Sequence, residues 1–209
     1  MGNDYFLEMV KKNFKEDEPI FIDEILALFS DYTKAYVFRL LKEENEEIRN
    51  FSRGVYFLPK KTFFGESNIT SNMVANKKYV SNGEDTYGVY AGISLLNAFG
   101  ITSQVPNVLE IITNKEATRK RTIDIKGKQF ILRKSRFSID NNNLGYYYIL
   151  QLFLEMPEKC ELNDFSREMI IQYIKNKKLN PESLVKYSLY FPGRTLKNVV
   201  NSGVFNGIV

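Results

Sequence analysis

The sequence contains no histidine and a single cysteine, Cys160, and these two absences exclude several kinds of chemistry. Acid–base catalysis by histidine and metal ligation by histidine are excluded outright. One thiol forms neither a disulfide nor a cysteine-type zinc site within its own chain. We interpret Cys160 as a small, partly buried apolar residue. The sequence therefore predicts no metal site, and we expect no cofactor.

Long apolar runs are missing as well. No stretch of the 209 residues approaches the ~18–20 apolar residues that span a bilayer. The first residues are mixed polar and amphipathic, unlike a secretory signal. We therefore expect a cytoplasmic protein with no membrane partner. The length is sufficient for one or two domains with a real core.

The net charge of +4 is distributed unevenly along the chain. Residues 1–60 hold 9 Lys and Arg against 12 Asp and Glu, so this part is acidic. Residues 115–136 hold nine Lys and Arg against only Glu116 and Asp124. Such a concentration of positive charge points to an anionic partner of the second half of the chain.

The first 60 residues have the sequence pattern of a winged helix-turn-helix. Apolar spacing predicts a helix over residues 3–14, an extended entry at 20–22 and a second helix over 24–29, capped by Asp23. A turn at residues 30–31 caps a third helix that ends near residue 44. Two strands, 48–51 and 54–58, follow and are joined by Ser52-Arg53. We expect this α+β domain to place its third helix in a DNA major groove and its hairpin on the backbone.

The core face of the third helix decides which of its residues contact DNA. We place Ala35, Phe38 and Leu41 on the core face, supported by Val37 and Leu40, which turns Thr33, Tyr36 and Arg39 outward with Lys34 at the border. Arginine binds guanine with two hydrogen bonds, and hydroxyls reach phosphates or base edges. A domain of this type can instead serve protein contacts alone or act as a scaffold. The predicted DNA contacts are Thr33, Lys34, Tyr36, Arg39, Arg49, Ser52 and Arg53.

Residues 61–209 have the pattern of a larger α/β-type domain with a small sheet and C-terminal helices. A linker at 60–71 precedes helices over 69–79 and 87–99, with a turn at Asn82-Gly83 and a helix stop at Gly100. Strands are expected at 108–113, 119–125 and 130–134, with a tight turn at Lys126-Gly127. The final helices are expected at 144–155, 164–175, 181–189 and 195–200.

The basic cluster falls on the predicted strands. In a strand, alternate residues share a face, so Arg119 and Arg121 are expected on the same face. The cluster is either an ordinary solvated surface or a second contact with nucleic acid. Its members are Lys115, Arg119, Lys120, Arg121, Lys126, Lys128, Arg133, Lys134 and Arg136.

Two sequence motifs are similar to those of a known family. The hairpin ends in Gly54-Val55-Tyr56, and the later segment reads TYGVYAGISLLNAFGITSQVPNVLEIITN over residues 86–114. In their order and spacing, which cover roughly residues 20–140, these motifs resemble the AbiEi-like antitoxins of abortive-infection type IV toxin–antitoxin systems. The helices after residue 140 match only in pattern.

The resemblance implies a regulator with two activities. The winged helix would bind inverted repeats in double-stranded promoter DNA and repress its own operon. The second domain would antagonise a nucleotidyltransferase-type toxin without forming a stable complex with it. The shared motif either specifies the fold, through Gly92, Gly100, Asn97 and Gln104, or contributes Tyr90, Gln104 and Asn114 to a recognition surface.

Two alternatives to this hypothesis remain. In the first alternative, the chain is a plain winged-helix transcription regulator without antitoxin activity. In the second, it is a nuclease-like or RNA-binding protein that uses the basic strands. A metal-dependent nuclease needs two or three converging carboxylates, and the strands offer only Glu110 and Asp124. No glycine-rich phosphate loop is present. We therefore predict no catalytic residues and no enzymatic activity.

Overall fold

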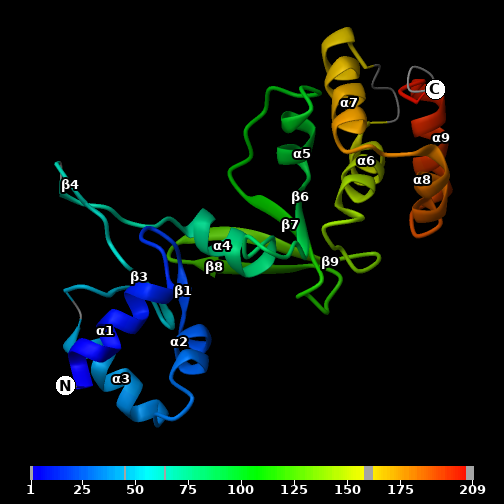
Figure 1. Ribbon diagram of the computed structural model, residues 1–209. Helices are drawn as coiled ribbons and strands as arrows, with labels where there is room; N and C mark the ends of the chain where they lie inside the picture. The colour runs from blue at the N-terminus through cyan, green and yellow to red at the C-terminus, as the bar shows by residue number, and fades with distance from the viewer. Residues whose placement is uncertain (1, 45, 64, 158–161, 206–209) are drawn as a thin grey trace. The chain divides into compact units, whose positions relative to one another are not determined.

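The computed structural model describes residues 2–44, 46–63, 65–157 and 162–205, so Cys160 lies outside the described residues. The chain is a mixture of helices and small sheets of the α+β class (Figure 1). It divides into two compact units, Met1–Lys77 and Lys78–Val209. This division lies later than the predicted boundary after residue 60. Among the described residues, no helix is both long and apolar enough to cross a membrane.

The first unit begins with three helices and a small antiparallel sheet. The elements of this part in chain order are α1 (Gly2–Asn13), β1 (Ile20–Phe21), α2 (Ile22–Leu28), α3 (Lys34–Glu43), β2 (Arg49–Ser52) and β3 (Val55–Phe57). The sheet has the strand order β1-β3-β2. Phe6, Val10, Ile25 and Leu40 are fully buried in the core that the helices share with this sheet. The amphipathic spacing of the three predicted helices is thereby explained.

The predicted hairpin is confirmed, but both predicted helix caps are wrong. Strands β2 and β3 pair antiparallel, and Gly54 at their turn has a φ of 74°. Helix α2 begins at Ile22, and its cap is the Glu24 carboxylate, which accepts from the Phe21 N–H at 2.7 Å. Helix α3 is capped by Thr33, whose hydroxyl accepts from the Tyr36 N–H at 3.3 Å. Asp23 and the turn at 30–31 do not perform these roles.

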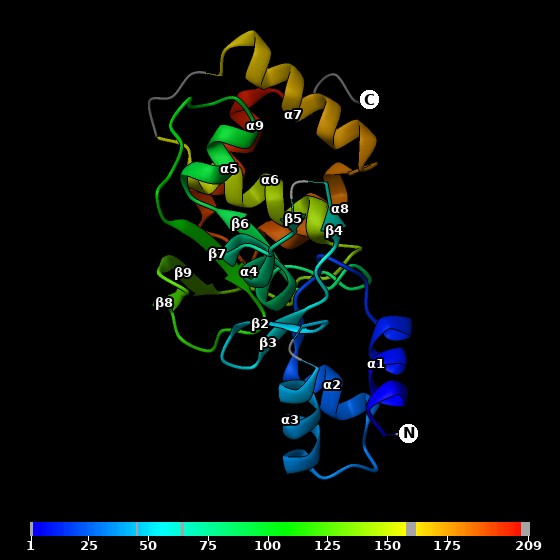
Figure 2. The same ribbon diagram turned by 90° about the vertical axis from the view of Figure 1, so that its left-hand side faces the viewer.

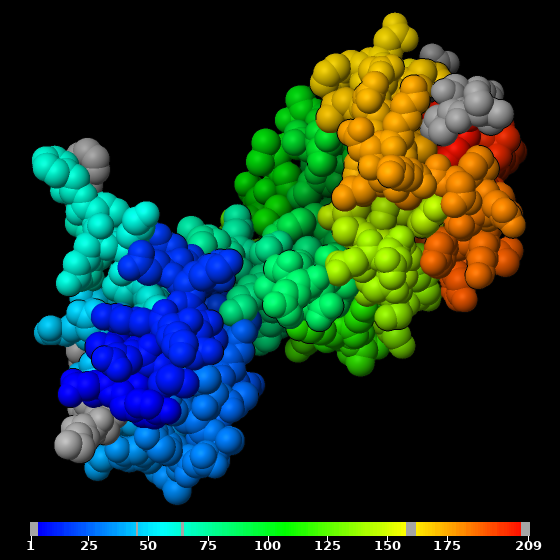
Figure 3. Space-filling view, viewed as in Figure 1, coloured from blue at the N-terminus to red at the C-terminus, as the bar shows by residue number. Residues whose placement is uncertain are grey.

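The predicted linker contains a second, two-stranded hairpin, β4 (Lys61–Thr62) and β5 (Gly65–Glu66). It projects from the body of the first unit (Figure 3), and Phe63 at its tip is 98% exposed. The hairpin was not predicted because the segment is polar and because two-residue strands are too short to show the alternation of apolar and polar residues. Helix α4 (Ser71–Tyr79) follows and buries Val74 and Ala75.

The second unit is built on a mixed four-stranded sheet (Figure 2). Its strands are β6 (Gly88–Ala91), β7 (Leu109–Thr113), β8 (Arg121–Ile125) and β9 (Lys128–Lys134), in the order β6-β7-β9-β8. Strands β7 and β9 are parallel, whereas the other neighbours pair antiparallel. The predicted turn at Lys126-Gly127 is confirmed, since both residues have a positive φ.

The predicted helix over residues 87–99 is wrong in its first half. The chain forms β6 there, turns at Gly92 with a φ of 66°, and only then forms α5 (Ile93–Ala98). Val89 and Ala91 are buried on one face of the sheet with Ile112. The segment is apolar on nearly every residue, so its periodicity does not separate a strand from a helix. The predicted stop at Gly100 is confirmed: it has a φ of 68°, and its N–H donates to the Asn97 carbonyl at 2.9 Å.

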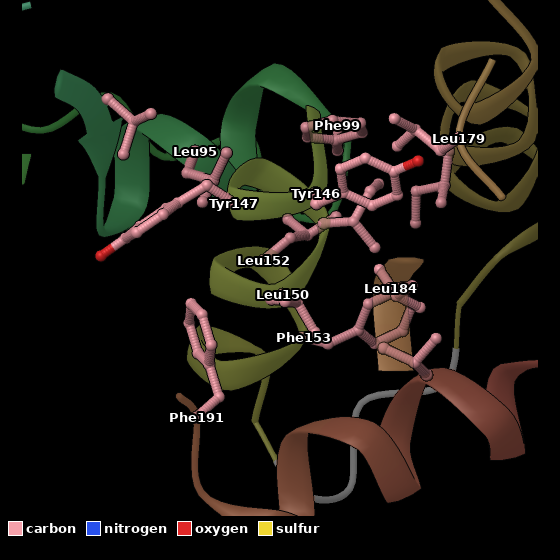
Figure 4. Packing of buried hydrophobic residues seen from close by; sticks show 14 of the residues in the cluster. Leu95, Phe99, Tyr146, Tyr147, Leu150, Leu152, Phe153, Leu179, Leu184 and Phe191 are labelled. Carbon is pink, nitrogen blue, oxygen red and sulfur yellow. The ribbon is translucent and has the colours of Figure 1, made fainter. Parts of the chain in front are cut away.

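Helix α6 (Leu144–Glu155) is the centre of the second core and packs against α5, α8 (Pro181–Ser188), α9 (Gly193–Ser202) and β6. Helix α7 (Asp164–Asn176) contributes Ile170 and Ile174 to the same core. Consecutive residues Tyr146 and Tyr147 direct their hydroxyls to opposite sides of this core (Figure 4). The Tyr146 hydroxyl accepts from the Asn180 side chain at 3.0 Å, and that of Tyr147 from the Arg136 N–H at 3.1 Å.

Candidate functional site

Helix α3 is turned relative to the predicted core face. Val37, Leu40 and Leu41 are buried, whereas Ala35 is exposed and Phe38 keeps 41% of its surface exposed. The prediction placed Ala35 and Phe38 on the inner face because both are apolar. The i, i+3, i+4 spacing of the three buried residues is equally helical, and packing selects it. The exposed face therefore carries Lys34, Ala35, Phe38, Arg39 and Lys42.

This rotation changes the role of the predicted contact residues on α3. Thr33 is exposed and caps the helix, as described above. Tyr36 is half-buried, with its ring edge-on to that of Tyr32 at 5.0 Å between centroids. Arg39 remains outward, lies 4.7 Å from the centroid of the Tyr36 ring and is 3.5 Å from the Glu43 carboxylate. Lys42 and Phe38 belong to this face and were missed, because both depend on the choice of the buried stripe.

The predicted wing residues differ in how far their charge is compensated. The Arg49 guanidinium donates to the Glu66 carboxylate of β5 at 2.8 Å. Ser52 is half-buried, and Arg53 is exposed beside the turn at Gly54. The Lys11 ammonium, 2.7 Å from Glu47, holds the pKa of that carboxyl below its ordinary value. Glu47 therefore stays ionised next to β2 and adds negative charge to this end of the unit.

The basic cluster of the second unit does not form one continuous face. Lys115 lies 3.5 Å from the centroid of the Tyr87 ring, and Arg121 pairs with Glu116 at 2.8 Å. Arg119 precedes β8, so the strand alternation that was expected to place it beside Arg121 does not apply. Lys126 lies in the turn between β8 and β9, and Lys128 is the first residue of β9. The remaining members surround a pocket.

This pocket, which we call the basic pocket, has a volume of about 800 Å³. It lies where the parallel strands β7 and β9 end, between the sheet, the segment before β8 and helix α6. In open α/β sheets, ligand sites usually lie outside the carboxyl ends of the parallel strands. Its lining is Glu110, Ile112, Ala117, Arg119, Lys120, Arg133, Lys134, Ser135, Arg136, Tyr147 and Gln151.

A partly buried polar network forms the floor of the basic pocket. The Arg133 guanidinium donates to Glu110 and to Glu155, at 3.2 Å each. Glu155 also accepts from the Gln151 side chain at 2.6 Å and from the Gly92 N–H. Burial raises the pKa of Glu155, against the opposing effect of its hydrogen bond from Gln151 and the charge of Arg133. The Oε1 atom of the fully buried Gln151 has no hydrogen-bond partner within the described structure.

Two residues hold the chain around the mouth of the basic pocket. The Asn114 side chain accepts from the Ile139 N–H at 2.9 Å and donates to the Ile139 carbonyl at 2.7 Å. Glu116 is 5% exposed and accepts from the Thr118 N–H at 3.0 Å. Hydrogen bonds from Thr118 and Arg121 lower the pKa of Glu116 to about 2. The Asn114 side chain thus serves the fold, whereas Gln104 is exposed and Tyr90 half-buried.

The two carboxylates considered for catalysis have structural partners. Glu110 is held by Arg133, and Asp124 accepts from the Gly127 N–H at 2.9 Å and so closes the β8–β9 turn. Within the described ranges, no three His, Cys, Asp or Glu side chains are grouped so that they could hold a metal ion. The cationic side chains that line the basic pocket are suited to the binding of anions.

The sequence does contain a signal for the floor of the basic pocket. Gln151 is the only strongly polar residue in the apolar run YYYILQLFL of α6. A buried carboxamide in such a run needs a partner. The partner of its amide nitrogen, Glu155, lies four residues along the same helix, a spacing that the sequence shows. The contact of Glu155 with Arg133 of β9, however, cannot be read from the sequence.

Comparison with known proteins adds no further assignment. The chain matches no family model, and no curated protein matches it.

Proposed function

We propose that the chain is a cytoplasmic DNA-binding transcription regulator whose first unit is a winged helix-turn-helix. The observation that carries the proposal is the order of α2, α3 and the β2–β3 hairpin, with cations exposed on both α3 and the hairpin. Lys34, Arg39 and Lys42 project from one face of a ten-residue helix, and Arg53 lies at the wing tip. A helix of this kind fits a major groove, and the wing follows the adjacent backbone.

The surrounding acidity limits this interface to a few contacts. Arg39 has Glu43 beside it, and Arg49 is paired with Glu66. Sequence-independent attraction is therefore small, and specificity depends on base contacts from α3. Arg39 is the residue suited to guanine, and its position over the Tyr36 ring orders the side chain before binding.

The experiment is a gel shift with the DNA directly upstream of the coding sequence, titrated across salt. The variant Lys34→Ala with Arg39→Ala should weaken binding and lower the slope of log K against log salt by about 1–2, since each phosphate contact contributes ~0.9. Lys12→Ala with Lys15→Ala is the matched control, since it removes the same charge at exposed positions outside α3. A complete lack of shift at low salt, or equal weakening by both variants, contradicts the proposal.

We also propose the antitoxin role that the motif resemblance implies. In this role the protein represses its own operon at promoter inverted repeats, and its second unit antagonises a nucleotidyltransferase-type toxin. The motif over residues 86–114 supports it, because Gly92 and Gly100 both occupy backbone conformations that favour glycine. Co-expression with a toxin of this type encoded next to the gene tests the role. Rescue of growth is expected, and failure of rescue with intact DNA binding leaves the plain regulator.

A further inference from the structure

The basic pocket differs from a surface that merely attracts nucleic acid. Its volume of about 800 Å³ falls within the range of small-molecule sites, ~300–1,000 Å³. Five cationic side chains and the carboxylate of Glu110 line it, and Arg133 pairs with both Glu110 and Glu155 of the floor. Such a concave, positively charged site matches a compact polyanion better than the regular backbone of a duplex.

The cations are of two kinds. Arg133 is fixed by Glu110 and Glu155, and the Arg136 guanidinium lies 5.2 Å from the centroid of the Phe191 ring. Arg119, Lys120 and Lys134 are exposed at the rim, and in the described part of the chain no carboxylate pairs with them. Fixed guanidinium groups next to flexible cations suit more than one phosphoryl group, since each phosphoryl oxygen accepts several charge-assisted hydrogen bonds.

The floor offers a hydrogen-bond acceptor, which phosphate oxygens do not satisfy. Gln151 Oε1 is buried without a partner, and a carboxamide oxygen accepts but does not donate. A buried acceptor without a donor is costly, so a ligand that brings an N–H or O–H group is favoured there. The Tyr147 hydroxyl accepts from the Arg136 N–H, and its own proton can be donated to a ligand.

We propose that the basic pocket binds a nucleoside polyphosphate, with its phosphates on Arg119, Lys120, Lys134 and Arg136 and an amino or hydroxyl group of the nucleoside on Gln151. This site is separate from the proposed DNA interface on α3. It also goes beyond that function, because it assigns a small-molecule ligand to the second unit.

Isothermal titration of the full chain with ATP, GTP, CTP and UTP tests the proposal. At least one nucleotide should bind, and Arg119→Ala with Lys120→Ala should weaken it about tenfold or more. Lys128→Ala with Lys78→Ala is the matched control, because both lysines lie in the second unit and neither lines the basic pocket. Absence of binding by all four nucleotides, or equal loss in the control, overturns the proposal.

A second variant separates nucleotide recognition from simple attraction of anions. Gln151→Met keeps the volume but removes the acceptor, so nucleotide affinity should fall while the affinity for tripolyphosphate stays unchanged. If tripolyphosphate binds as tightly as every nucleotide and Gln151→Met alters neither, the pocket is only an anion site and the proposal is wrong. A single-stranded RNA should displace no bound nucleotide if the free nucleotide is the ligand. If the RNA binds more tightly than the nucleotide and competes with it, the proposal is wrong.

The nucleotide result is independent of the DNA result. The variant Lys34→Ala with Arg39→Ala should bind nucleotide as the unchanged protein does. Loss of nucleotide binding in that variant contradicts a separate site, whereas failure of the gel shift alone concerns only the proposed regulator.

Discussion

The two units of this chain handle positive charge in opposite ways. The first unit carries 11 Lys and Arg against 13 Asp and Glu, and exposes a few cations on the outer face of α3. The second carries 18 against 12 and gathers five of its cations around the basic pocket, whose floor is a partly buried polar network. A few cations on a convex helix suit an extended partner, whereas cations around a hollow suit a compact one. The distinction lies in geometry more than in net charge.

The largest effect is expected from a substitution that tests which face of α3 is buried. Leu40→Ala removes a fully buried side chain and should lower the free energy of unfolding by about 2–5 kcal/mol. Ala35→Gln should change it by no more than about 0.5 kcal/mol, because Ala35 is exposed. Urea unfolding measures both. If Ala35→Gln is as damaging as Leu40→Ala, Ala35 belongs to the core and the exposed cationic face is wrongly placed.

A comparable test lies in the sheet of the second unit. A Cβ at Gly88 would lie 2.0 Å from the Tyr79 carbonyl oxygen and 2.9 Å from that of Ile112. Gly88→Ala should therefore cost about 1–3 kcal/mol or more, since backbone must shift. Gly193→Ala is the control, because a Cβ there meets nothing within 4 Å. Hydrogen exchange should show the loss of protection concentrated in the second unit; equal loss in the first contradicts the division into two units.

A smaller, pH-dependent effect is expected at the mouth of the basic pocket. The pKa of Glu116 is about 2 in the fold and 4.5 in the reference state, so the ionised carboxylate stabilises the fold above pH ~4.5. That contribution is lost as the pH falls toward 2. Glu116→Gln should cost about 1–3 kcal/mol at pH 7. Urea unfolding across pH should show the two proteins converging in acid; a constant difference argues against this ionic role.

The smallest effect distinguishes the two arginines of the wing. Arg53→Ala should weaken DNA binding a few-fold and lower the salt slope by about 1. Arg49→Ala should weaken it less, because the charge of Arg49 is already compensated by Glu66 at 2.8 Å. Gel shifts at two salt concentrations measure both. A larger loss from Arg49→Ala would mean that the pair with Glu66 opens on DNA.

Features that depend only on neighbouring residues were correctly predicted from the sequence. The hairpin around Gly54, the turn at Lys126-Gly127 and the helix stop at Gly100 follow from glycine in positive-φ positions. The start of α8 at Pro181 matches the helix expected over residues 181–189, since proline suits the first turn of a helix. These signals act within a few residues, so they are legible in the chain itself.

Which faces are buried, and which distant residues come into contact, depends on the packing of the whole fold. Two helical stripes of α3 were possible, and packing chose Val37, Leu40 and Leu41. The apolar run at residues 88–91 became a strand because β7 offered it a partner. The basic pocket joins Glu110, Arg133 and Gln151, which lie far apart in sequence. Such contacts are set by sheet register and helix packing. They could not be predicted from the sequence, because neither is encoded in the spacing of a single segment.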